Sequence, residues 1–123
     1  MDEHKWTLYY DDGTSSAIVH ISITDLNTVQ FEVELGSIPQ QTEVVVQFHA
    51  TNLHNNQTFY TDSNGLEMQK RVLNYRPTWD LVAKNLADSN QNISANYFPV
   101  NSAISLNDPS KTMTVSNDRS QGG

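Results

Sequence analysis

Histidines are the side chains of this sequence most suited to binding a metal, and their spacing fits no metal site. They stand at His4, His20, His49 and His54. A metal site needs three or four converging ligands with supporting partners, and on a strand only residues two apart share a face. We therefore expect solvated or singly hydrogen-bonded imidazoles, and no metal-binding residue in this chain.

Paired carboxylates could serve glycoside hydrolysis, which places two of them about 5–9 Å apart across the scissile bond. Asp11 and Asp12 are adjacent ahead of a glycine turn, so we expect them to face apart. Glu32 and Glu34 share the polar face of an amphipathic stretch, where solvated side chains are the simpler interpretation. The sequence therefore nominates no catalytic residue.

The segment "DSNGLE" at residues 62–67 has the acidic and amide residues of a calcium loop. It is too short and supplies too few ligands for that ion. A hairpin turn whose aspartate caps its own backbone explains the same residues. We therefore predict a turn here and no ion.

Two Asn-x-Ser/Thr triplets begin at Asn56 and Asn92, next to expected loops. Such a triplet is the acceptor of N-glycosylation in a secreted protein. Both asparagines are glycosylation candidates if the parent protein is secreted.

The segment "NYRPTW" at residues 74–79 combines two aromatic rings with a cation. Arg76 precedes a proline and is pushed toward an extended conformation, so its guanidinium can stack between or beside Tyr75 and Trp79. The segment can be a sugar-stacking platform or an anchor where a strand leaves its sheet. We favour the anchor.

Composition and net charge limit the classes of partner that this chain can bind. Its 123 residues suit one domain, and the formal net charge is −7 with no cation cluster larger than Lys70-Arg71. We therefore expect neither nucleic acid nor an anionic membrane as a partner, because both need arrayed cations. The chain has no cysteine, no apolar run long enough to cross a membrane, and no recognisable targeting signal.

Alternation of apolar and polar residues predicts the elements that must position these side chains. In "FEVEL" the residues Phe31, Val33 and Leu35 share one face. The same period recurs at residues 16–23, 42–50, 58–61, 66–72, 96–100, 102–106 and 112–116. Asn64-Gly65 predicts a hairpin over residues 57–72. Helix signals are weak, with at most a short turn over residues 78–90 and a surface loop at 87–92. The fold class expected is an all-β antiparallel sandwich.

Four ordered blocks, "LGSIP", "FYTDSNG", "YRPTW" and "DRSQGG", extend this interpretation. With the sequence around them, from about Phe31 to Gly123, they resemble the C-terminal β-domain of glycoside hydrolase family 38, in particular the α-mannosidases of the lysosomal type. We expect the resemblance to extend over the first thirty residues as well.

That resemblance implies a zinc-dependent, retaining parent enzyme that removes α-mannose from N-glycans, in a lysosome or vacuole or secreted. It also implies that the nucleophile, the acid/base residue and the zinc ligands belong to an upstream catalytic domain, whose motifs are not found here. The chain is then a galactose-mutarotase-like β-sandwich segment over residues 1–123, truncated at its C-terminal edge. We expect it to bind no cofactor, to be inactive by itself and to be prone to association. Its partners would be the catalytic domain and mannose-containing glycans.

Four residues are candidates for the mannoside cleft or the domain interface: Arg76, Trp79, Tyr97 and Arg119. Arg119 can offer a hydroxyl-binding fork, or can pair with Asp118 or a neighbouring strand. An alternative function is a stand-alone carbohydrate-binding module that stacks sugars on Tyr60, Tyr75, Trp79 and Tyr97. A third is a purely adhesive surface domain.

Overall fold

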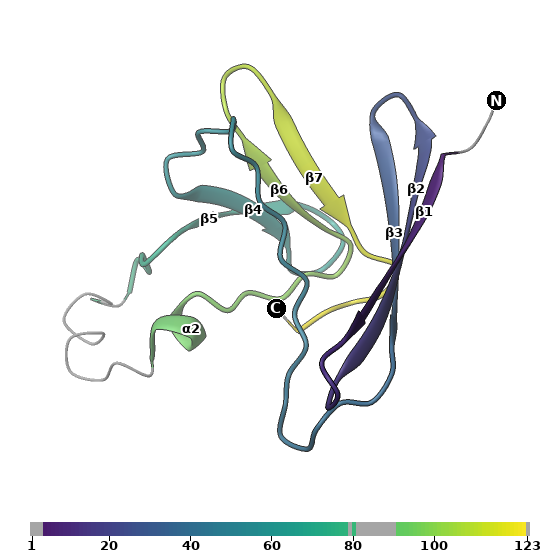
Figure 1. The fold of residues 1–123 in the computed structure, drawn as a ribbon. Coiled ribbons are helices and arrows are strands. Elements are labelled where there is room, and N and C mark those ends of the chain that lie inside the picture. The colour runs from purple at the N-terminus through teal and green to yellow at the C-terminus, as the bar shows by residue number, and fades with distance from the viewer. Residues whose placement is uncertain (1–3, 79, 81–90, 123) are drawn as a thin grey trace. The chain divides into compact units, whose positions relative to one another are not determined.

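Among the residues that the structure describes, nearly all regular structure is antiparallel β-strand (Figure 1). The structure is a computed structural model, and it describes residues 4–78, 80 and 91–122. The chain divides into two compact units, an N-terminal unit (Met1–Phe48) and a C-terminal unit (His49–Gly123). Each unit contains one antiparallel sheet, so the all-β antiparallel fold class is confirmed. A single sandwich segment over residues 1–123 stays a prediction.

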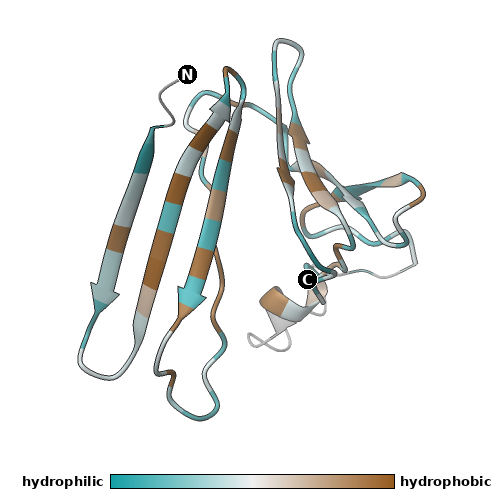
Figure 2. Ribbon diagram, turned by 90° about the vertical axis from the view of Figure 1, so that its right-hand side faces the viewer, coloured by the Kyte–Doolittle hydropathy of each residue, from teal (hydrophilic) through white to brown (hydrophobic). Residues whose placement is uncertain are grey.

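The sheet of the N-terminal unit has the order β1-β2-β3, built from β1 (Lys5–Asp11), β2 (Ser16–Asp25) and β3 (Thr28–Leu35). Its register aligns Leu8, Val19 and Val33 across the three strands, so the alternating apolar residues share one face. Figure 2 shows this alternation as brown and teal bands along the strands. The pattern in β2 and β3 is as the sequence predicts, whereas β1 was not anticipated.

The turn between β1 and β2 is held by aspartate side chains. The Asp12 carboxylate accepts hydrogen bonds from the backbone N–H groups of Ser15 at 2.7 Å and Thr14 at 2.9 Å. Gly13 adopts a positive φ of 85°. The Ser15 bond, followed by those from Thr14, lowers the pKa of Asp12. Asp11 caps the Gly13 N–H at 2.7 Å, so both carboxylates serve the turn.

Residues 42–50 were predicted to form a strand, and that prediction is wrong. The segment is irregular, and no described strand lies beside it in a hydrogen-bonded ladder. A strand exists only where a second strand supplies partners for its backbone, and alternation in the sequence does not supply that second strand.

The sheet of the C-terminal unit has the order β5-β4-β6-β7, all antiparallel. Its strands are β4 (Thr58–Asp62), β5 (Met68–Val72), β6 (Ala103–Asn107) and β7 (Thr112–Ser116). The predicted hairpin is confirmed as β4-β5, with Thr58 opposite Val72 and Asp62 opposite Met68. Gly65 takes a positive φ of 73° in its turn.

Two further expectations of the sequence differ from the structure. Residues 96–100 form no strand, and only Val100 makes an isolated bridge, to Gln121. Pro99 has no N–H to give to a ladder, which accounts for the interruption. A short helix, α2 (Gln91–Ala95), begins inside the stretch expected to be a loop. The weak helical signal at residues 78–90 falls almost wholly outside the described residues.

Burial is concentrated in the C-terminal unit. Phe98 is the buried apolar side chain among the described residues, at 6% exposure, and Thr61, Asp62 and Ser105 are buried polar residues. Each of them lies in or beside the four-stranded sheet. Among the described residues no helix has the length and apolar character that a membrane crossing requires.

Candidate functional site

The best-ordered cluster of candidate residues surrounds the buried ring of Phe98. The guanidinium carbon of Arg76 lies 4.0 Å from the ring centroid. Arg76 also donates to the carbonyl oxygen of Ala95 from Nε at 3.3 Å and from Nη2 at 3.1 Å. Ala95 ends α2, so the cation satisfies a carbonyl that has no partner within the helix. Arg76 therefore acts as an anchor, which is the interpretation of "NYRPTW" that the sequence favours over a sugar-stacking platform.

A second cation and a second ring complete this Phe98 cluster. The guanidinium carbon of Arg71 lies 4.9 Å from the Phe98 centroid, and its Nε donates to Thr61 Oγ1 at 3.2 Å. Phe59 meets Phe98 edge to face at 5.4 Å. The sequence pointed to Tyr75 and Trp79 as stacking partners of Arg76 and did not single out Phe98. The only signal for Phe98 was its place in an apolar stretch, "NYFPV".

Tyr97 connects this cluster to the C-terminal tail. Its carbonyl oxygen lies 3.5 Å from Arg76 Nη2, at the long limit of a hydrogen bond. A Cβ atom built on Gly122 would stand 3.0 Å from the Tyr97 hydroxyl oxygen, so the tail passes close to that side chain. The structure therefore brings together three residues that lie apart in the sequence: Arg76, Tyr97 and Gly122.

Arg119 and Trp79 lie outside this cluster, for different reasons. Arg119 donates to the Asp118 carboxylate, with Nη2 3.0 Å from Oδ2, and both side chains are strongly exposed. The hydrogen bond and then the charge of Arg119 lower the pKa of Asp118. Of the two alternatives for Arg119, the structure shows the pairing with Asp118. Trp79 falls outside the described residues.

The two sequon asparagines lie at the start of ordered elements. Asn56 is exposed, has a positive φ of 47° and lies two positions before the first residue of β4. Asn92 belongs to α2. Their glycosylation stays a prediction.

A buried carboxylate that the sequence misassigned lies at the end of β4. Asp62 accepts hydrogen bonds from the N–H groups of Ala103 and Ser102, both at 2.9 Å, and from the Ser102 hydroxyl. These bonds, led by the one from Ala103, lower its pKa from the ordinary value of 3.8 to about 2. The prediction that this Asp caps its own turn is wrong, because it joins β4 to β6 and Asn64 caps the turn instead, at Leu66 N–H.

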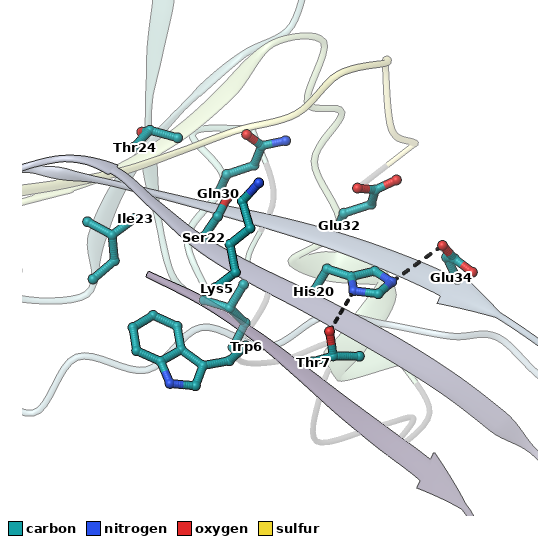
Figure 3. Close-up of a pocket in the computed structure, with 11 residues that line it drawn as sticks. Lys5, Trp6, Thr7, His20, Ser22, Ile23, Thr24, Gln30, Glu32 and Glu34 are labelled. Atoms are coloured by element: carbon teal, nitrogen blue, oxygen red, sulfur yellow. Dashed lines mark hydrogen bonds and ion pairs between the residues drawn. The ribbon is translucent and has the colours of Figure 1, made fainter. Parts of the chain in front are cut away.

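A hollow of about 410 Å³ lies over the polar face of the β1-β2-β3 sheet, and Figure 3 shows its side chains rising from neighbouring strands. Here both ring nitrogens of His20 have partners: Nδ1 lies 3.0 Å from Thr7 Oγ1, and Nε2 lies 3.5 Å from Glu34 Oε1. The sequence predicted at most one partner for each imidazole. It missed this pairing because the residues come from three different strands.

The order hydroxyl, imidazole, carboxylate is that of a hydrolase triad. Activating a hydroxyl in this way depends on excluding water, however, and the side chains of His20 and Glu34 are 41% and 59% exposed. We assign these contacts to cross-strand stabilisation. Among the described residues, no group of three or more histidine, cysteine or acidic side chains could hold a metal ion.

Comparison with known proteins bears directly on these features. Residues 7–123 match the family model described as "Glycosyl hydrolases family 38 C-terminal domain". The chain is 42% identical over 80 residues to a lysosomal alpha-mannosidase of Dictyostelium discoideum, over 63% of this chain and 7% of that protein. It is 41% identical over 99 residues to a probable alpha-mannosidase of Arabidopsis thaliana, and 39% to human lysosomal alpha-mannosidase, each over 77% of this chain and 9% of the relative. The chain thus spans less than a tenth of the length of these relatives.

Proposed function

The chain belongs to the glycosyl hydrolase family 38 C-terminal domain family, and from that membership we propose that it is a non-catalytic β-domain portion of an α-mannosidase. In this proposal the parent enzyme removes α-mannose from N-glycans, and this portion supports its catalytic domain and helps wall the mannoside cleft. The observation that carries the proposal is the family match over residues 7–123. The parent would reside in a lysosome or vacuole or be secreted, since several relatives are named lysosomal.

The zinc ion that the family implies does not fit the described residues of this chain. The described residues contain no group of three or more histidine, cysteine or acidic side chains that could hold a metal ion. The carboxylate oxygens of Asp62 accept hydrogen bonds from Ser102 and Ala103, and Asp12 Oδ1 accepts hydrogen bonds within the β1-β2 turn. In this proposal the zinc ion is bound by the catalytic domain of the parent enzyme. The fold we propose for the intact region is a sandwich of the galactose-mutarotase type.

Contact with the rest of the parent enzyme would fall to exposed groups beside the Phe98 cluster. Tyr97 is 47% exposed, and the tail passes its hydroxyl at Gly122. Arg119 is exposed on the same tail, and its guanidinium pairs with the carboxylate of its sequence neighbour Asp118. An Arg paired at the surface can exchange a carboxylate for sugar hydroxyls at small cost, because exposed ion pairs contribute little. Tyr97 and Arg119, with Arg76 as their support and Trp79 as a fourth candidate, are the residues we assign to the cleft or interface.

An assay with a chromogenic α-mannoside tests the non-catalytic role. We expect no turnover by the purified chain, with or without added zinc. Turnover that a chelator abolishes would contradict the proposal. In the full-length parent, the variant Arg119→Ala should leave the melting temperature unchanged and raise KM for an α-mannoside. An unchanged KM would remove Arg119 from the cleft while leaving the non-catalytic role in place.

A stand-alone carbohydrate-binding module is the second candidate, and exposed aromatic rings favour it. Tyr75 is 58% exposed and Tyr97 is 47% exposed, so both present faces on which a sugar can stack. Titration calorimetry of the chain with a mannose oligosaccharide separates the two functions. A supporting domain gives no heat, whereas a module gives weak binding that Tyr75→Ala or Tyr97→Ala abolishes while the fold persists.

A further inference from the structure

The turn that joins β4 to β5 carries the dipeptide Asn64-Gly65, whose backbone and side chain can react with each other. Asn64 is the one asparagine of the sequence that is followed by glycine. Residues 63–67 lie between the two strands and outside their hydrogen-bonded ladder. All five are exposed, and Leu66 is 87% exposed. Water therefore reaches the Asn64 side chain.

A nucleophile and an electrophile of acyl transfer are adjacent in this turn. Among the described residues, no hydrogen bond reaches the Gly65 N–H group, so its nitrogen is not held in the sheet. The Asn64 side-chain carbonyl accepts a hydrogen bond at Oδ1 from the Leu66 N–H at 3.0 Å. That donor polarises the amide and stabilises the negative charge that develops on Oδ1 when a nucleophile attacks Cγ.

Gly65 also leaves the path of attack open. Its φ is 73°, and a Cβ atom built on it would meet no heavy atom within 4 Å. A glycine backbone rotates more freely than that of any other residue, so the Gly65 nitrogen can swing toward the Asn64 Cγ. Because both groups belong to one short stretch of chain, the reaction is intramolecular and gains from proximity.

We propose that Asn64 is a site of spontaneous deamidation. The Gly65 nitrogen loses its proton to water and attacks Asn64 Cγ, which closes a succinimide ring through a new C–N bond. The Cγ–Nδ2 bond breaks, and Nδ2 takes a proton from water and leaves as ammonia. Water then opens the ring at either carbonyl and leaves an aspartyl or an isoaspartyl residue. This inference goes beyond the proposed function and does not depend on it.

The isoaspartyl product would change the hairpin, because its main chain runs through Cγ and the turn becomes one atom longer. In the sheet as described, β5 is an edge strand and pairs with β4. The longer turn also loses the hydrogen bond from Leu66 N–H to Asn64 Oδ1. Amide hydrogen exchange over Met68–Val72 should therefore be faster in the isoaspartyl product than in the fresh chain.

Incubation of the whole chain at neutral pH and physiological temperature tests the proposal. Ion-exchange chromatography should reveal a species with one negative charge more than the formal −7 of the sequence, and peptide mapping should place the new carboxylate at position 64. Asn64→Gln should abolish that species, because its longer side chain cannot close the same ring. Asn27→Gln is the matched control: it replaces an exposed turn asparagine that Thr28 follows, and it should leave the species unchanged.

Two further variants test the geometry of the turn. Gly65→Ala restricts the backbone and should slow the reaction about tenfold or more, which is about 1.4 kcal/mol of activation free energy. Leu66→Pro removes the N–H that donates to Asn64 Oδ1 and should also slow it. Circular dichroism confirms that each variant keeps its strands. An unchanged rate in Leu66→Pro would overturn the activating role of that N–H.

Two results would overturn the proposal as a whole. One is a chain that keeps its Asn64 amide through the incubation, or whose new charge maps to another asparagine. The other is a folded chain that reacts more than about tenfold slower than the same chain in urea, because the fold would then protect Asn64.

Discussion

The guanidinium of Arg76 lies against the Phe98 ring at 4.0 Å and at the same time donates to the carbonyl oxygen of Ala95 at 3.1 Å. One side chain thus joins the segment after β5, the buried aromatic ring and the last residue of α2. Arg76 precedes Pro77, and a following proline favours an extended backbone over a helical one at that position.

Removal of the Arg76 side chain should therefore destabilise the C-terminal unit. Arg76→Ala loses the stacking and the carbonyl bonds, and we expect a loss of about 1–3 kcal/mol in the free energy of unfolding. Arg76→Lys keeps the charge but not the planar fork and should recover only part of this loss. Urea unfolding followed by circular dichroism measures both. Lys70→Ala removes an exposed cation two residues before β5 ends and should cost far less; equal losses would argue against the anchor.

Truncation of Phe98 should have a larger effect, because this ring is the buried apolar centre of the described chain at 6% exposure. Phe98→Ala removes the surface on which Arg71, Arg76 and Phe59 pack, and we expect about 3–5 kcal/mol of destabilisation. Tyr75→Ala removes an aromatic ring of similar size from an exposed position and should have little effect. The same urea experiment compares the two variants. Similar midpoints would show that the core lies elsewhere.

Acid should loosen the link between β4 and β6 that Asp62 provides. Its pKa is lowered to about 2, so the stabilisation is complete above its ordinary value of 3.8 and is lost as the pH falls from about 4 through 2. The pKa of Asp108 is also lowered, chiefly by the hydroxyl and then the N–H of Ser110, and adds to the loss in the same direction. Asp62→Asn should melt several degrees lower at pH 7 and show a flatter pH dependence.

Thermal melts between pH 7 and pH 2 measure this prediction. Ser102→Ala provides a graded comparison, because it removes one donor to Asp62 and leaves the backbone bonds from Ser102 and Ala103. Its acid response should fall between that of the unmodified chain and that of Asp62→Asn. An Asp62→Asn variant with the full acid dependence of the unmodified chain would show that other groups govern it.

The approach of the tail to Tyr97 should be sensitive to one methyl group. Gly122→Ala places a Cβ 3.0 Å from the Tyr97 hydroxyl oxygen, so that half-exposed ring must shift. We expect a cost below the roughly 1–3 kcal/mol of an overpacked core, because the ring can move toward solvent. The NMR shifts of the Tyr97 ring should change in Gly122→Ala. Tyr97→Phe, which removes the hydroxyl, should abolish the added cost of the alanine; additive effects of the two changes would exclude the contact.

The sequence by itself determined those features of the fold that depend on residues close together in the chain. Alternation in "FEVEL" and "SAIVHISI" fixed the apolar faces of β3 and β2, Asn64-Gly65 marked the β4-β5 hairpin, and four ordered blocks indicated the family to which the chain belongs. These signals are local because side-chain direction alternates along any strand and because turns depend on a few residues.

Tertiary structure alone decided which distant residues meet. The Asp62 carboxylate accepts hydrogen bonds from Ser102 and Ala103, about forty positions away, and not from its own turn. The imidazole of His20 contacts Thr7 and Glu34, which lie on the two neighbouring strands. The same strand pattern became β3 at residues 28–35 and an irregular segment at 42–48. Backbone pairing and charge contacts join residues by distance in space, and local sequence carries no record of which strand will lie alongside.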